Sequence, residues 1–204
     1  MKSKARSFWK VCVTAAVGVW VVSLVSCASS GITLFKLAPA QGQISTASVH
    51  DNQVVLSARY LDAGDRMMHL RERGYEALGL GLSQVPLVAF ALSVENSSDQ
   101  SVILDPASIR LAVGYGPLLS PYNYAHLYIE LPRGSDRQRI LEDLRKAIFD
   151  KSTTISACEV SEKLLLFKRP DKVGPAAAIL FERLYVGGEK FQAVLDFKAV
   201  DLEK

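Results

Sequence analysis

Apolar and polar residues alternate along much of the chain with the two-residue period of β-strands. Residues 53–60 are rich in β-branched side chains, and residues 85–95 are apolar on both faces, which predicts a central strand. Gly187-Gly188 predicts a hairpin between two long strands. In the last strand one face carries Phe191, Ala193, Leu195, Phe197 and Ala199. The other segments expected as strands are 108–113, 153–158, 163–168, 176–186 and 189–200.

Two segments have the spacing of amphipathic helices. Residues 61–75 place apolar side chains on one face and the Arg and Glu residues outward, and Gly74 is the expected stop. In residues 135–148, Ser135 and Gln138 match a capping box. The apolar stripe of this helix is Ile140, Leu141, Leu144 and Ile148. Residues 114–132 hold three prolines and four tyrosines and are expected to form a long loop.

About seven strands with one or two inserted helices are typical of a two-sheet antiparallel sandwich. Residues 88–104 (VAFALSVENSSDQSVIL) form an apolar strand that runs into Glu-Asn-Ser-Ser, and residues 164–167 read Leu-Leu-Leu-Phe. These two features resemble the Ig-like sandwich domains of small exported bacterial lipoproteins. The resemblance implies a mainly β, Ig-like antiparallel β-sandwich, and we expect it at residues 53–204.

The N-terminal segment has the composition of an export signal. Its basic residues are Lys2, Lys4, Arg6 and Lys10, and an uncharged apolar run follows. Leu24-Val25-Ser26-Cys27 resembles the lipobox of bacterial lipoproteins. This resemblance implies cleavage between Ser26 and Cys27 and lipidation of Cys27. The Ser-, Ala-, Gln-, Gly- and Thr-rich composition of residues 28–50 indicates a tether, and its residues 32–37 are expected to dock on the domain. The expected division is thus a signal peptide at 1–26, a lipidated tether at 27–52 and the domain at 53–204.

Two alternatives for this segment stay open. Residues 11–26 would span about 24 Å as a helix, which is less than the ~30 Å hydrocarbon core. The uncharged run at 11–35 has 25 residues, however, so a retained single-span anchor is the second interpretation. The third is an ordinary signal peptide, which would leave Cys27 able to form a disulfide with Cys158. In Gram-negative lipoproteins, Ala28 and Ser29 at these positions imply export to the outer membrane.

Charge argues against nucleic-acid binding. The whole chain has a formal net charge of +3, but residues 1–26 hold four of the 24 basic residues and none of the 21 acidic ones. The remaining chain therefore has 20 basic and 21 acidic residues, for a net charge of −1. A basic binding face is thus not expected. Cys158, the one cysteine left after lipidation, is expected to be a small buried hydrophobic residue.

Motifs that carry catalysis or cofactors are absent from the sequence. His50, His69 and His126 are far apart and lack metal-ligand spacing, so we expect surface or interface side chains, no metal site and no cofactor. The chain has no G-x-S-x-G elbow, and no histidine lies near Cys158 in the sequence. We therefore expect no enzymatic activity. An envelope hydrolase with a site assembled around His126 is the alternative.

One group of side chains suggests a partner surface. Amphipathic aromatic residues favour protein interfaces, and the expected loop at 114–132 concentrates them: Tyr115, Tyr122, Tyr124, His126 and Tyr128. The simpler interpretation is that they hold the loop against the sandwich. The sequence as a whole predicts a lipid-anchored protein of the bacterial cell envelope that binds or assembles with another envelope protein and performs no catalysis.

Overall fold

The computed structural model describes residues 35–39, 44–134, 136–171 and 175–201. The expected signal peptide, the lipobox with its Ser26–Cys27 cleavage site, and Ser135 of the expected capping box lie outside the described residues. No helix of the described part is long and apolar enough to cross a membrane.

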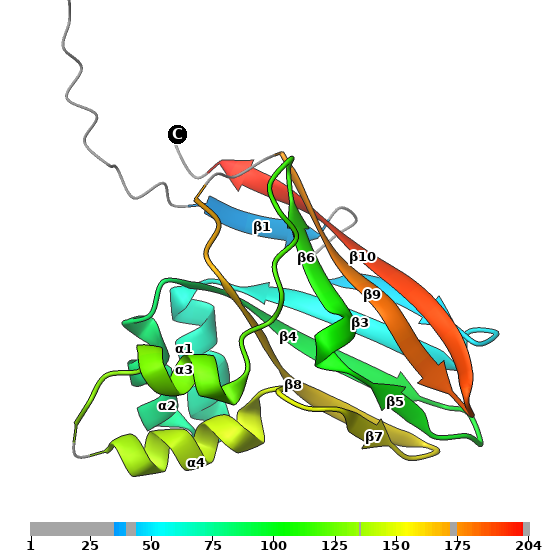
Figure 1. The fold of residues 1–204 in the computed structure, drawn as a ribbon, viewed down its shortest axis with the longest axis horizontal. Helices are drawn as coiled ribbons and strands as arrows, with labels where there is room; N and C mark the ends of the chain where they lie inside the picture. The colour runs from blue at the N-terminus through cyan, green and yellow to red at the C-terminus, as the bar shows by residue number, and fades with distance from the viewer. Residues whose placement is uncertain (1–34, 40–43, 135, 172–174, 202–204) are drawn as a thin grey trace, which may run out of the picture. The chain divides into compact units, whose positions relative to one another are not determined.

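The described residues are mainly β and form two antiparallel sheets (Figure 1). The larger sheet has the order β1-β10-β9-β5-β7, with β6 also paired to β9. Its β9–β10 hairpin turns at Gly187 and Gly188, whose φ angles of 58° and 94° suit glycine. The strands are β1 (Phe35–Pro39), β5 (Val102–Leu104), β6 (Ile109–Val113), β7 (Thr153–Ile155), β9 (Ala176–Val186) and β10 (Glu189–Asp201).

The smaller sheet has the order β2-β3-β4-β8. Five consecutive residues of β4, from Val88 to Leu92, are buried, because both faces of this sheet are covered. The expectation of a central strand at 85–95 is therefore confirmed. The strands are β2 (Ser45–Val49), β3 (Val54–Leu61), β4 (Leu87–Asn96) and β8 (Glu159–Lys168).

Alternate side chains of the two sheets meet in one apolar core. Phe90 of β4 lies at its centre, with ring centroids 6.0 Å from Phe167 of β8 and 5.0 Å from Phe197 of β10. All three side chains are buried. The expected two-sheet arrangement is thus present, although with ten described strands rather than about seven.

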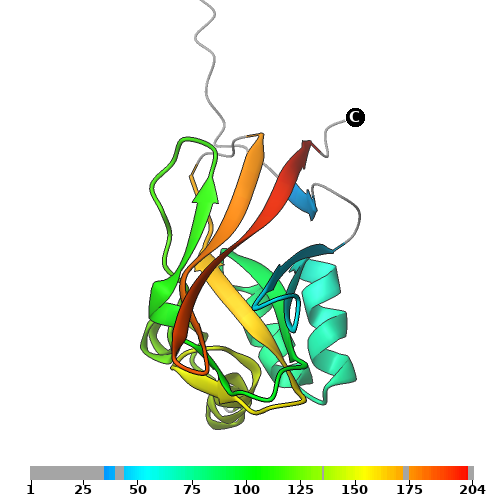
Figure 2. The same ribbon diagram turned by 90° about the vertical axis from the view of Figure 1, so that its right-hand side faces the viewer.

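In the described part of the chain, four α-helices cover the other face of the smaller sheet. Leu61, Ala89 and Leu164, which point away from the inter-sheet core, pack with the helices into a second apolar cluster. In Figure 2 the β9–β10 hairpin lies toward the viewer and the helices lie behind the strands. The helices are α1 (Ala63–Glu72), α2 (Glu76–Ser83), α3 (Tyr124–Glu130) and α4 (Arg137–Ala147), and a 3₁₀ turn, η1 (Pro106–Ser108), precedes β6.

The expectation of one or two inserted helices is wrong, because α2 and α3 arise where loops were expected. A Cβ on Gly79 would lie 2.9 Å from the Met67 sulfur, and one on Gly81 would lie 3.3 Å from the Leu131 side chain. The glycines of α2 therefore allow close packing rather than breaking the helix. In α3, the Asn123 side chain caps the first turn by accepting from the His126 N–H at 3.0 Å.

The expectation of a tether at 27–52 is wrong for Phe35–Pro39 and Ser45–Val49, because these two segments are strands of the domain. β1 pairs with β10, and β2 pairs with β3. The expected docking of residues 32–37 is thus met at Phe35–Leu37, the part that the structure describes. These strands complete sheet edges through contacts with distant parts of the chain, which the composition of the segment does not reveal.

Helix α4 confirms the expected apolar stripe. Ile140, Leu141 and Leu144 are buried, and Ile148 is buried as the residue that ends the helix. Among the described residues, the Gln138 Nε2 donates to Glu142 Oε1 at 2.9 Å, and the expected capping box with Ser135 stays a prediction.

Candidate functional site

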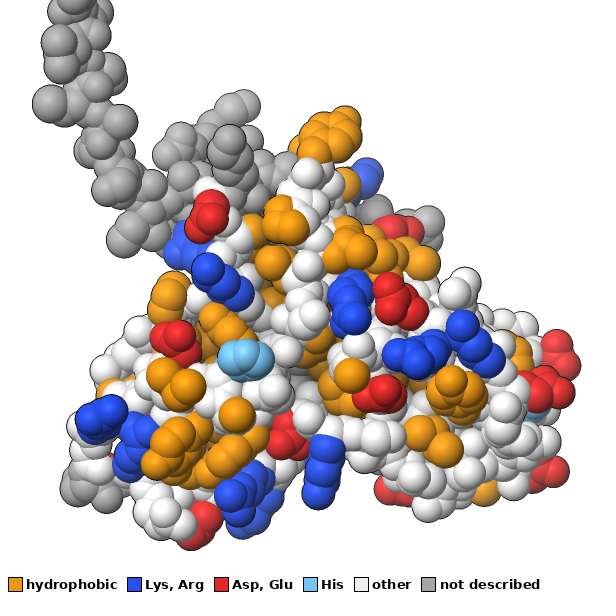
Figure 3. Space-filling model, in the orientation of Figure 1, with side chains coloured by type: hydrophobic (Ala, Val, Ile, Leu, Met, Phe, Trp, Pro, Cys, Tyr) orange, Lys and Arg blue, Asp and Glu red, His pale blue; other side chains and the backbone are white. Residues whose placement is uncertain are grey.

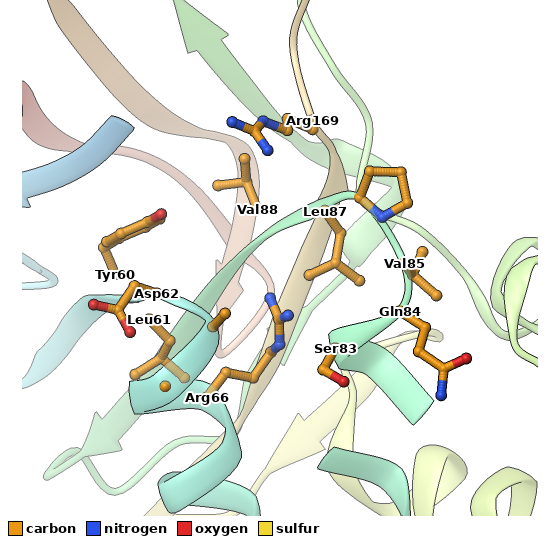
Figure 4. Close-up of a pocket in the computed structure, with 13 residues that line it drawn as sticks. Tyr60, Leu61, Asp62, Arg66, Ser83, Gln84, Val85, Leu87, Val88 and Arg169 are labelled. Carbon is orange, nitrogen blue, oxygen red and sulfur yellow. The ribbon is translucent and has the colours of Figure 1, made fainter. Parts of the chain in front are cut away.

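A pocket of about 500 Å³ lies where β3 passes into α1 and where α2 passes into β4 (Figure 4). We call it the Arg66 pocket. The pocket is lined by Tyr60, Leu61, Asp62, Ala63, Gly64, Arg66, Ser83, Gln84, Val85, Pro86, Leu87, Val88 and Arg169. Its residues come from both ends of the α1–α2 pair and from the adjacent strand ends, so the fold of the helical layer creates it.

Arg66 is the buried cation of this pocket, with 4% of its surface exposed. Its Nη2 donates to the Leu82 carbonyl oxygen at 3.2 Å, near the C-terminal end of α2, where a positive charge is favoured. Its Nε is buried and has no hydrogen-bond partner among the described residues. Burial lowers the pKa of Arg66, and the neighbouring Tyr60 and Asp62 act in the opposite direction.

Tyr60 and Asp62 lie on one side of the pocket, and Arg169 lies beside Val88 at the top of the view in Figure 4. Asp62 caps α1 by accepting from the Asp65 N–H at 2.8 Å. Burial raises the pKa of Tyr60, with a further contribution from Asp62, so its hydroxyl stays protonated at neutral pH. The arrangement places cationic and polar groups beside an apolar wall.

The sequence prediction missed this pocket because it placed the arginines of residues 61–75 on the outer face of the helix. Arg66 instead points inward. A signal was present, since Arg66 lies one helical turn before Leu70, and residues at that spacing share a face. Tyr60 and Arg169 come from segments more than 100 residues apart, so their proximity could not be inferred locally.

His69 was expected to be a surface or interface side chain, but it is buried within the domain, with 5% of its surface exposed. It lies on the inner side of α1. Its Nε2 is 3.8 Å from the Glu162 carboxylate, and its Nδ1 is 3.5 Å from Arg59 Nη2. Arg73 forms the closer ion pair with Glu162, at 2.7 Å. The pKa of His69 is lowered, first by burial and then by Arg73. A hollow of about 320 Å³ beside this cluster is also lined by Lys146.

The tyrosines of the expected partner surface differ in how far they are exposed, and they do not form one surface. Tyr122 and Tyr124 are half-buried and pack against the helical apolar cluster, so they hold α3 in place. Tyr128 is about half exposed, and Arg137 lies 4.6 Å above its ring. Tyr115 is fully exposed on the turn after β6, and it lines a hollow whose described lining includes no residue of α3.

Hydrophobic side chains mixed with Lys and Arg remain exposed over the α3–α4 region (Figure 3). Arg145 stacks on the Tyr124 ring at 4.5 Å, which adds to the attachment of α3 to α4. The simpler interpretation, in which aromatic residues hold this segment onto the domain, therefore describes Tyr122 and Tyr124. An outward surface is left mainly to Tyr128 and its exposed neighbour Ile129.

The other singled-out residues lie apart from the Arg66 pocket. His126 is exposed on α3, with the Tyr122 ring centroid 5.8 Å away, and His50 packs edge-on against Phe191 at 5.6 Å. Cys158, expected to be buried, is exposed in a turn with φ 57°. Among the described residues, no group of three or more His, Cys, Asp or Glu is placed to hold a metal ion.

No protein-family model matches this chain, and no curated protein matches it. Solved structures with a partly similar course include the yjhA protein of Bacillus subtilis, with 9% identity, a TM-score of 0.37, and coverage of 67% of this chain and 76% of that one. Another is the Northeast Structural Genomics Consortium target SoR45, with 11% identity, a TM-score of 0.34, and coverage of 76% and 91%. These similarities are too distant to assign a family or a function.

Proposed function

We propose that this chain is a lipid-anchored binding module of the bacterial cell envelope, with an Ig-like sandwich as its framework and no catalytic role. The lipobox-like Leu24-Val25-Ser26-Cys27 supports the anchor. The single observation that supports the binding role is the Arg66 pocket, in which a buried cation lies beside an apolar wall. Pockets of about this size with a few polar groups are the usual sites for small ligands.

The lipid anchor would hold the binding domain at the membrane, so the ligand would be bound there. A single acyl chain gives reversible membrane attachment, whereas two or more chains make it effectively permanent. Lipoproteins of this type carry several chains on the modified cysteine, palmitate among them. Ala28 and Ser29 favour the outer membrane as the destination, and an envelope protein remains the proposed partner, with the α3 surface around Tyr128 as its candidate contact.

Two alternatives have less support. A hydrolase centred on His126 would need a nucleophile or an orienting carboxylate close to the imidazole. Among the described residues, the backbone N–H of His126 donates to the Asn123 side chain, and its ring packs against the Tyr122 ring. Neither contact supplies a nucleophile or an orienting carboxylate. An uncleaved single-span protein would present the same domain, and residues 11–35 are the segment that would span.

Metabolic labelling with an alkyne analogue of palmitate tests the anchor. We expect the full-length protein, expressed in a Gram-negative host, to incorporate the label and to fractionate with membranes. Cys27→Ser should abolish labelling, because the thiol that receives the lipid is gone. Cys12→Ser is the matched control and should label like the wild type. Equal labelling of Cys27→Ser and the wild type would refute lipidation at Cys27.

A further inference from the structure

The walls of the Arg66 pocket indicate the class of ligand that it would hold. We propose that the pocket binds a small carboxylate attached to a short apolar group, an inference that rests on the binding role proposed above. A free branched-chain acid and the C-terminus of a peptide ending in an aliphatic residue share this chemistry. The argument follows from charge, from donor geometry and from the apolar wall.

The charges that line the pocket favour one negative charge on the ligand. Arg66 and Arg169 contribute two positive charges and Asp62 one negative charge, so the lining side chains sum to +1. A monoanion balances this sum. A dianion such as phosphate would exceed this sum, and the carboxylates of Asp62 and of Asp65, in the first turn of α1, would oppose it more strongly than they oppose a monoanion.

The guanidinium of Arg66 is held in place before any ligand arrives. The bond from its Nη2 to the Leu82 carbonyl fixes its plane, and the group points into the space between Asp62 and Leu87 (Figure 4). A fixed planar guanidinium matches the planar carboxylate better than it matches a tetrahedral anion. A ligand carboxylate would also bring a counter-charge to a buried cation that has an unpaired Nε.

The rest of the pocket suits a short aliphatic group. Leu61, Val85, Leu87 and Val88 line it, and all but Leu87 are buried residues of the helical or inter-sheet clusters. Their side chains are held by the surrounding core, so the wall is preformed. At about 500 Å³ the space admits a small molecule and excludes a folded chain.

Calorimetric titration of the full-length protein in detergent tests the assignment. The probes are N-acetyl-L-leucine, its neutral amide N-acetyl-L-leucinamide, isovalerate and inorganic phosphate. We expect the two carboxylates to bind and the amide to bind roughly tenfold more weakly or worse, because a hydrogen bond to a charged group is lost. Phosphate should bind more weakly than either carboxylate. The tighter of the two carboxylates identifies the source, a peptide C-terminus or a free acid.

Substitutions then locate the site. Arg66→Met keeps the apolar stem and should abolish carboxylate binding, while Arg66→Lys should weaken it because the planar fork is lost. Arg169→Gln, at a half-buried position, should weaken binding roughly tenfold and decides the matter if the Arg66 variants do not fold. Arg183→Gln, on the exposed face of β9, is the matched control and should bind like the wild type.

Three results would overturn the assignment: equal affinity for acid and amide, tighter binding of phosphate than of the carboxylates, or equal behaviour of Arg169→Gln and Arg183→Gln. The proposed lipid anchor is tested separately from the proposed ligand class. A protein that carries lipid but ignores carboxylates would refute the ligand class alone, whereas one that binds carboxylates without lipid at Cys27 would refute only the anchor.

Discussion

His69 is a buried imidazole whose surroundings act on its proton. Arg59 of β3 and Arg73 after α1 disfavour the charged ring, while Glu162 of β8 and Glu72 of α1 favour it. Burial is the largest influence, and the net result is a pKa below the ordinary value of about 6.5. Between the folded and unfolded pKa values, the unfolded chain therefore binds more protons than the folded one.

This difference fixes the sign of a pH effect on the free energy of unfolding. The contribution of neutral His69 is fully present above about pH 6.5 and is lost as the pH falls through the lower folded-state pKa. We expect urea unfolding of His69→Gln to show a smaller loss of stability between pH 7.5 and 5 than that of the wild type. His126→Gln removes an exposed imidazole, leaves His69 in place, and should retain the wild-type loss. Parallel profiles for His69→Gln and the wild type would contradict this account.

The buried charge of Arg66 can act in two ways, by stabilising the fold and by binding a ligand. Its bond to Leu82 joins α1 to the end of α2, so some of its effect is structural. The unpaired Nε and the adjacent space are the features that a purely structural role leaves unexplained. The carboxylate titration distinguishes the structural role from the binding role, because only the binding role depends on the charge of the probe.

At the scale of elements, Asn96 links the two sheets. It ends β4 of the smaller sheet, and its Nδ2 donates to the carbonyl oxygens of Ser156, after β7 of the larger sheet, at 2.8 Å and of Gln100 at 2.7 Å. Its Oδ1 accepts from the Ser98 backbone N–H and hydroxyl. In the Glu-Asn-Ser-Ser segment, Asn96 and Ser98 are therefore buried and hydrogen-bonded to each other, while Glu95 and Ser97 are exposed.

Replacing the amide of Asn96 by a carboxylate should be costly. In Asn96→Asp an oxygen would face the two carbonyl oxygens that now receive hydrogen bonds, in a site that is 1% exposed. We expect a loss of about 3 kcal/mol or more in the free energy of unfolding, measured by urea denaturation. Asn123→Asp is the matched control, because an exposed helix N-cap accepts Asp as readily as Asn. Similar losses in both variants would show that the Asn96 network is not important.

The elements that sequence reasoning predicted are those with local signals. The β9–β10 hairpin has its Gly187-Gly188 turn, and β4 has its continuous apolar run. The elements it missed depend on distant contacts. β1 forms by pairing with β10. The glycines of α2 are explained by the close approach of Met67 and Leu131, which the sequence around them does not reveal. The Arg66 pocket belongs to this second kind, since its walls come from β3, both helices of the α1–α2 pair and the end of β8.

At the scale of the whole molecule, the position of β1 limits how far an anchored domain could reach. Eight residue steps separate Cys27 from Phe35, where β1 begins, and a fully extended chain of that length spans about 28 Å. If Cys27 carries lipid as proposed, the domain stays close to the membrane surface, and the proposed partners and ligands would be met nearer the bilayer than a tether of 26 residues would allow.

The anchor is the central claim, and the intact mass of the protein purified from its native membrane tests it most directly. We expect a mass that begins at residue 27 and includes several acyl chains, and a Cys27→Ser variant that lacks the acyl mass. A mass that begins at Met1 would contradict the account. It would show a retained N-terminal segment and leave Cys27 without lipid.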